Sequence, residues 1–186
     1  VAQMTRAALV VREVLGDRPL GVNVLRNDAD AALAVAATVG AAFVRVNVHS
    51  GVMVTDQGVI TGSPRRTLLT RRLLGANTHV AADVHVKHAA PLGAQDLAQS
   101  ARDTALRAGA SALIVSGTGT GRPTDPERLR QVRQAVPSHP VWIGSGLTPA
   151  RAADLLPHAD AAVVLRPVWQ ILGHIFDLCG CAHEIP

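Results

Sequence analysis

Six short valine-rich runs alternate with longer Ala-, Leu- and Arg-rich stretches, and this alternation restricts the fold more than any other feature of the chain. The runs lie near residues 20–25, 42–48, 79–86, 111–116, 140–144 and 160–165. The stretches between them have a helical period near residues 3–15, 28–39, 64–74, 94–109, 125–136 and 148–156. Strands that alternate with helices form a parallel sheet with helical crossovers. The sequence therefore predicts an α/β fold.

Local signals mark the ends of these helices. Asp28 and Asp125 precede two of them as N-caps, and Thr148 stands before Pro149, which favours the first position of a helix. Glycines follow four of the helices as expected C-caps, namely Gly16, Gly40, Gly75 and Gly109.

The number of strands distinguishes two architectures. A closed (β/α)8 TIM barrel typically takes about 250 residues, whereas this chain has 186 residues. We therefore expect a partial (β/α)8 barrel with six parallel strands, and a doubly wound open sheet is the alternative. In a partial barrel the open edge favours pairing with a second copy, so we include a homo-oligomer among the expected partners.

Composition and charge limit the class of protein. With 48% hydrophobic and 17% charged residues, the chain suits a compact domain with a real core. It contains neither a long uncharged apolar run nor the layout of a signal peptide, so we predict a cytoplasmic protein without a transmembrane segment. The formal charge of +4 raises the question of nucleic acid. However, the one arginine cluster lies on a predicted helix, where it forms a solvated face. With only two Phe, two Trp and no Tyr, the chain also has few rings for base stacking. No nucleic-acid partner is therefore predicted.

The two cysteines, Cys179 and Cys181, lie near the end of the chain with His174 and His183 close by. A lone C-x-C pair is weak evidence for zinc, because a structural site needs four ligands. We predict no metal site, and the sequence does not identify a cofactor.

Three strands carry polar residues at every second position. In 79–88, Asp83, His85 and Lys87 alternate with valines and alanines, and side chains on a strand alternate between its two faces. The same pattern places Asn23 and Asn27 on one side of the first strand, and Arg45, Asn47 and His49 on one side of the second. Buried polar groups need partners, so this face is expected to line the lumen at the carboxyl ends of the strands, where barrels hold their sites. The alternative is an internal hydrogen-bond network without a ligand.

The predicted site has catalytic and binding members. Of 18 Lys and Arg residues only Lys87 is a lysine, and an amine can act as a base, form a Schiff base or hold an anion as a point charge. His85 is a candidate acid or base, and Asp83 is a candidate to orient it or to bind a cation. The remaining residues expected to bind substrate are Asn23, Arg26, Asn27, Arg45, Asn47 and His88.

Two glycine-rich turns follow later strands. They are Ser116-Gly117-Thr118-Gly119 and Gly144-Ser145-Gly146. Glycine lets backbone N–H groups approach an anion, and in barrels the loops after the seventh and eighth strands commonly hold phosphate. We therefore expect these residues to bind phosphate.

Several runs together resemble the BtpA/SgcQ family, in the family's order: PLGVNVLRNDADAALA (19–34), FVRVNVHSGVMVTDQGVITG (43–62), ADVHVKHAAPL (82–92), ALIVSGTGTGRPTD (112–125) and IGSGLTP (143–149). The resemblance implies a ribulose-phosphate-binding type of TIM barrel whose third to eighth strands are the six seen here. It also implies a link to photosystem I biogenesis, while the reaction of the family is not settled. Residues 1–166 would form the incomplete barrel, and 167–186 a divergent C-terminal tail.

Three functions follow from these patterns. The first is a protein that binds or acts on a small phosphorylated metabolite, sugar-like or nucleoside-like, with Lys87 as its most informative residue. The second is a non-catalytic assembly or stability factor, and the third is a degenerate fragment without activity.

Overall fold

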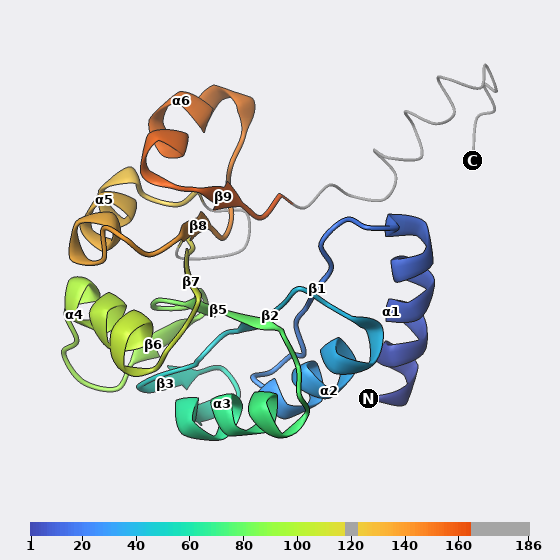
Figure 1. The fold of residues 1–186 in the computed structure, drawn as a ribbon. Helices are drawn as coiled ribbons and strands as arrows, with labels where there is room; N and C mark the ends of the chain where they lie inside the picture. Colours follow the sequence, from blue (N-terminus) through green and yellow to red (C-terminus); the bar gives the residue numbers. More distant parts are fainter. Residues whose placement is uncertain (118–122, 165–186) are drawn as a thin grey trace, which may run out of the picture.

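The computed structural model describes residues 1–117 and 123–164 (Figure 1). Six parallel strands form the main sheet in the order β1-β2-β5-β7-β8-β9, which is their order along the chain. They are β1 (Gly21–Val22), β2 (Phe43–Val46), β5 (His79–Asp83), β7 (Ala112–Val115), β8 (Val141–Ile143) and β9 (Ala161–Ala162). A doubly wound sheet would reverse its strand order midway. The sequential order therefore excludes that alternative within the described residues.

Helix α1 (Ala2–Leu15) precedes the first strand and packs on α2 (Ala29–Val39), and the other helices connect successive strands and cover one face of the sheet. Besides α2 they are α3 (Pro64–Leu73), α4 (Leu97–Arg102), α5 (Pro126–Ala135) and α6 (Ala152–Leu155), which lies between two 3₁₀ turns, Pro149–Arg151 and Leu156–His158. A π-helical turn, Asp103–Arg107, continues α4. Both predicted aspartate caps are present: Asp28 accepts a hydrogen bond from Ala31 N, and Asp125 accepts one from Glu127 N. Thr148 forms no side-chain cap bond.

Two apolar clusters lie between the sheet and its helices. In the first, Leu33 and Ala36 of α2 pack on Val44 and Val80. In the second, Leu113 and Val115 of β7 pack with residues of α4 and α5, among them Ala101 and Leu129. Val44 and Val80 lie on the face that the sequence pattern assigned to the helices.

The opposite face of the sheet curls around a small inner cluster. Phe43 on β2 and Trp142 on β8 meet edge to face with their ring centroids 5.1 Å apart, although β5 and β7 lie between their strands. In a flat sheet, strands three positions apart are separated by about 14 Å. The small side chains of Ala81 and Ala112 fill the space between, so the sheet bends toward this side as a barrel wall does. The predicted partial barrel is confirmed.

A second, antiparallel sheet follows the carboxyl end of the first, with strand order β4-β3-β6. Its strands are β3 (Val52–Thr55), β4 (Gly58–Thr61) and β6 (Ala89–Pro91). The first two form a hairpin, and β6 pairs with β3 from the segment that follows β5. This sheet, which was not predicted from the sequence, links the chain segments after β2 and β5.

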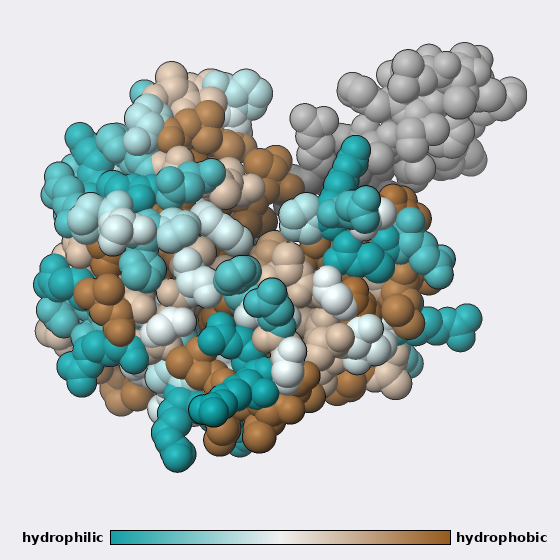
Figure 2. Space-filling view, viewed as in Figure 1, coloured by the Kyte–Doolittle hydropathy of each residue, from teal (hydrophilic) through white to brown (hydrophobic). Residues whose placement is uncertain are grey.

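Helix α1 keeps much of its apolar surface exposed, visible as brown at the right of Figure 2. Val10 is 56% exposed and Val14 is 84% exposed. No helix within residues 1–117 and 123–164 is long and apolar enough to cross a bilayer.

Candidate functional site

Asp83 occupies the carboxyl end of β5 on the inner face of the sheet. Its side chain is 0% exposed and forms a two-pronged ion pair with Arg45 of β2. Arg45 Nε lies 2.9 Å from Oδ2 and Nη2 lies 2.7 Å from Oδ1. Asn47 Nδ2 donates to Oδ2 at 2.9 Å, and the Ser116 hydroxyl approaches Oδ1 at 3.4 Å. The predicted meeting of Arg45, Asn47 and Asp83 is thus present in the structure.

This cluster is fully satisfied and leaves Asp83 little capacity for chemistry. Burial raises the pKa of the Asp83 carboxyl, while the hydrogen bonds from Arg45 and Asn47 act in the opposite direction. Both oxygens already accept bonds from protein donors. Asn23 supports the arrangement from β1, since its Nδ2 donates to Arg45 O at 2.8 Å and to Asn47 Oδ1 at 3.2 Å. Asp83 is therefore suited to fix Arg45 and Asn47 rather than to move protons.

The chain leaves the extended conformation immediately after Asp83. His85 and His88 have left-handed backbone angles, with φ of 52° and 61°. The prediction that Asp83, His85 and Lys87 share one side of an extended segment is therefore wrong, because period-two alternation holds only for extended residues. The first strand was also predicted too long: β1 ends at Val22, so Asn27 is not part of it.

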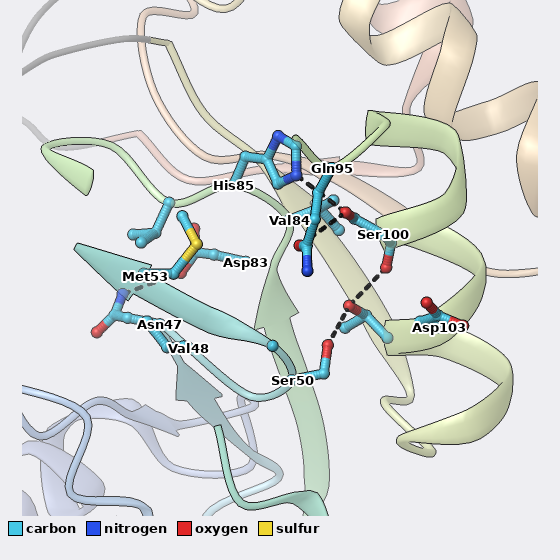
Figure 3. A pocket seen from close by; sticks show the side chains of 13 residues that line it. Asn47, Val48, Ser50, Met53, Asp83, Val84, His85, Gln95, Ser100 and Asp103 are labelled. Carbon is cyan, nitrogen blue, oxygen red and sulfur yellow. Dashed lines mark hydrogen bonds between the residues drawn. The ribbon is translucent and has the colours of Figure 1, made fainter. Parts of the chain in front are cut away.

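His85 faces a small cavity of about 60 Å³ beside the end of β5 (Figure 3). Its Nε2 lies 2.9 Å from the hydroxyl of Ser100 on α4. Burial and the positive charge of Arg128 lower the pKa of His85, while Asp96 opposes them. A neutral imidazole held by a serine hydroxyl at the edge of a cavity can exchange a proton with a bound molecule. The other polar side chains that line this cavity are Asn47, Ser50, Asp83, Gln95, Asp103 and Thr104.

Lys87 lines a different, larger pocket of about 150 Å³. The segment after β1 supplies its far wall, with Leu25, Arg26 and Asn27. Asn27 is fixed there by two bonds to Val48, one from Nδ2 to the carbonyl at 2.9 Å and one from the Val48 N–H to Oδ1 at 2.7 Å. His88, Val86 and Ile60 complete the lining, together with Asn47.

The two pockets are neighbours, since Asn47, Val48 and Val86 line both. Three non-glycine residues near them have left-handed backbones: Asn27 with φ of 61°, His85 and His88. Such conformations are uncommon outside glycine and gather at ligand sites, where the surrounding structure holds them in place. The polar residues and the backbone conformation thus point to the same region, the carboxyl ends of β1, β2 and β5.

The glycine-rich turns lie after β7 and β8, and the backbone donors of Gly117 and Gly144 bond to protein groups. Gly117 N–H donates to the Ser145 hydroxyl at 3.2 Å, and Gly144 N–H donates to Val115 O at 2.7 Å. A Cβ at Gly144 would lie 2.2 Å from Ser116 Oγ, so glycine is required there for close packing. Thr118 and Gly119 lie outside the described residues, as do Cys179, Cys181 and the rest of the predicted tail. Phosphate binding at these turns stays a prediction.

Some residues of the site carried no signal in the sequence. Ser50 reaches the His85 cavity from the residues before β3, Gln95 from those before α4, and Ser100 and Thr104 from α4 and the π-helical turn that continues it. A helix at 94–109 was predicted, but not that its polar face would approach the end of β5. His49, predicted on the lumen side, is instead buried, with its Nε2 bonded to Ala108 O at 2.9 Å after the π-helical turn.

Comparison with known proteins identifies the relationship. The model of the BtpA family matches residues 1–169. The chain belongs to the BtpA family. The resemblance noted from the sequence is thereby confirmed over most of the chain.

Among BtpA relatives, the photosystem I biogenesis protein BtpA of Synechocystis is 46% identical over 146 residues, which cover 78% of this chain and 51% of that protein. An uncharacterized protein of Thermococcus kodakarensis is 43% identical, covering 88% of this chain and 61% of that protein. The sgc region protein SgcQ of Escherichia coli is 29% identical, covering 84% and 59%. The chain thus spans about half to three fifths of the length of these relatives.

Solved structures share the barrel fold with this BtpA-family chain at low identity. 2,3-Dimethylmalate lyase, a member of the PEP mutase/isocitrate lyase superfamily, is 14% identical with a TM-score of 0.62, covering 95% of this chain and 64% of that one. A native KDPGal structure is 20% identical with a TM-score of 0.54, covering 88% and 65%. These likenesses concern the fold alone.

The described part of this BtpA-family chain offers no cluster of three His, Cys, Asp or Glu side chains able to hold a metal ion.

Proposed function

We propose that this BtpA-family chain binds a small phosphorylated metabolite at the carboxyl ends of β1, β2 and β5. The observation that carries this proposal is the pair of adjoining pockets that share Asn47, with His85 in one and Lys87 in the other. Barrels place their ligands at this end of the strands. In this proposal Asn47, Asn27 and Arg26 orient the ligand, Lys87 interacts with its charge, and His85 accepts or donates a proton.

The roles differ from residue to residue. Asp83 and Arg45 hold Asn47 in place, since their ion pair is closed and Asp83 is fully buried. His85 is the residue available for proton transfer, because its ring lines a cavity and bonds to the Ser100 hydroxyl. Lys87 is only half-buried and forms no ion pair with the residues that the structure describes. Its amine is thus available for an anion.

A thermal-shift screen tests the proposal. Sugar phosphates and nucleoside phosphates are compared with the same compounds lacking phosphate. A ligand at a concentration 100 times its Kd stabilises the folded state by about 2.7 kcal/mol, so a specific ligand raises Tm by several degrees while its unphosphorylated counterpart does not. The response should disappear in Lys87→Met and persist in Arg65→Met, which removes an exposed charge from α3. If phosphorylated and unphosphorylated compounds behave alike throughout the panel, the proposal is refuted.

A second candidate function is a non-catalytic role in assembly, favoured by the name of the Synechocystis relative, a photosystem I biogenesis protein that is 46% identical. In that case the pockets would carry a regulatory ligand or none. Substitution of His85 by Gln separates the two: it would leave an assembly role intact in a cell that depends on this protein, whereas it would abolish a role that needs proton transfer.

A further inference from the structure

The pocket around Lys87 has an excess of positive charge. Lys87 and Arg26 line it, and among its described lining residues none is Asp or Glu. Arg26 pairs with Asp56 outside the pocket, at 2.6 Å, but the Asp56 side chain is 63% exposed. An ion pair so exposed contributes at most about 1 kcal/mol and gives way to a better partner. The pocket therefore favours a group with negative charge.

The adjoining pocket around His85 has the opposite character. Asp83 and Asp103 line it, and its described lining includes no Lys or Arg. The charge of Asp83 is compensated by Arg45, whereas Asp103 meets Arg107 only at 3.9 Å on the exposed side of the helix. An anion in this pocket would face the Asp103 carboxylate, and Arg128, whose charge acts on His85, is not part of the lining. The polar groups that remain are hydroxyls, amides and an imidazole, which bind uncharged donors and acceptors.

The sizes agree with this division. The His85 cavity, at about 60 Å³, is less than half the size of the Lys87 pocket, so it suits the smaller, uncharged end of a ligand. The Lys87 pocket, at about 150 Å³, has room for a phosphate group.

We infer that the ligand has two unlike ends: its anionic phosphate group binds beside Lys87 and Arg26, and an uncharged hydroxyl or carbonyl end enters the His85 cavity past Asn47. This inference rests on the proposed function and specifies its ligand and orientation. It places the anion at the ends of β1 and β5, not at the glycine turns after β7 and β8, where the Gly117 and Gly144 donors already bond to protein groups.

The first experiment uses the fact that Lys87 is the only lysine of the chain. Reductive methylation with ¹³C-formaldehyde yields one labelled side-chain amine, and the labelled α-amine serves as an internal reference. Titration with inorganic phosphate should shift the Lys87 signal in a saturable manner and leave the reference unchanged. Lys87→Met should weaken phosphate binding by about tenfold or more, since it removes a charge-assisted hydrogen bond. The control Arg65→Met should change it by less than about twofold.

The outcomes separate this inference from the proposed function. If phosphate raises Tm while the Lys87 signal stays still, the anion binds elsewhere: the inference is wrong, and of the proposed function only the binding of a phosphorylated metabolite stands, without the role of Lys87. If neither inorganic phosphate nor any phosphorylated compound is bound, both fail. Equal phosphate affinity in Lys87→Met and Arg65→Met would also overturn the inference.

A second comparison tests the other end of the ligand. Glycerol 3-phosphate adds hydroxyl groups to a phosphate, so we expect it to bind more tightly than inorganic phosphate. Ser100→Ala, which removes the hydroxyl bonded to His85, should reduce the affinity for glycerol 3-phosphate several-fold while changing that for inorganic phosphate by less than about twofold. An equal loss for both compounds would show that the two pockets do not hold separate ends of one ligand.

Discussion

The ion pair between Arg45 and Asp83 should make single and double substitutions behave in opposite ways. The pair is enclosed: the side chains are 17% and 0% exposed. Burial raises the pKa of Asp83 despite its hydrogen bonds, which indicates that burying the carboxylate costs more than its partners return. Such a pair adds little net stability, but removing one partner leaves the other charge buried without compensation and is strongly destabilising.

The magnitudes follow from this difference. Asp83→Ala leaves the Arg45 guanidinium without its partner, and also removes an acceptor from Asn47. Breaking half of a buried pair costs about 3–5 kcal/mol. In a chain of this size that lowers Tm by roughly 6–20 °C. The double variant Arg45→Met with Asp83→Leu replaces both charges by apolar groups of similar size, so it should be more stable than Asp83→Ala despite carrying one more substitution.

Urea unfolding followed by circular dichroism measures all the variants on one scale, with the single variants Arg45→Met and Asp83→Leu completing the cycle for the double variant. The coupling between the two sites should be of the order of 1–3 kcal/mol in the direction that favours the double variant. Strictly additive losses would refute the reasoning, because they would mean that neither charge depends on the other. A loss below about 1 kcal/mol in Asp83→Ala would refute the claim that the pair is enclosed.

Three further effects are expected. Burial lowers the pKa of His49 in the folded chain. As the pH falls below about 6.5, the unfolded chain therefore takes up a proton that the folded chain does not, and stability drops until the folded-state pKa is passed. The urea midpoint of His49→Gln should accordingly depend less on pH between 7.5 and 5.5. Gly144→Ala places a Cβ 2.2 Å from Ser116 Oγ and should cost about 1–3 kcal/mol by overpacking, part of which Ser116→Gly should restore; an unchanged Tm for Gly144→Ala would contradict this packing. Asp28→Ala removes the cap that accepts from Ala31 N and should cost about 0.5–2 kcal/mol, measured by the same unfolding curves, whereas Asp28→Asn should be nearly neutral.

The order of elements could be predicted because each depends on local signals. Caps such as Asp28 and the glycine after α2 mark where helices begin and end, and alternating valines mark which face of a strand is covered. The meeting of Arg45, Asn47 and Asp83 followed from parity alone, since neighbouring parallel strands present equivalent positions to the same side.

The second sheet could not be predicted in the same way. Its strands are four, four and three residues long, and β6 pairs with β3 across more than thirty positions of chain. Pairings between distant segments leave little trace in a local pattern. The same holds for the approach of Ser100 to His85, which depends on how α4 packs rather than on its own sequence.

The segment after β5 was predicted to be extended, and the reason why it is not explains the form of the site. An extended continuation from Asp83 would carry Lys87 four residues onward, about 13 Å beyond the end of the strand, whereas β2 already ends beside Ala82. The Lys87 amine would then lie beyond the end of β2, where no neighbouring strand residue could form a pocket with it. The left-handed conformation of His85 ends the strand, and that of His88 leads into β6, which pairs with the hairpin. The chain between them returns toward Asn47, so that Lys87 and His85 line neighbouring pockets instead of one row. Tertiary contacts hold His85 and His88 in the left-handed conformation, which glycine adopts readily and β-branched residues do not. Substitution of either histidine by Gly should therefore preserve the turn, and substitution by Val should destroy it.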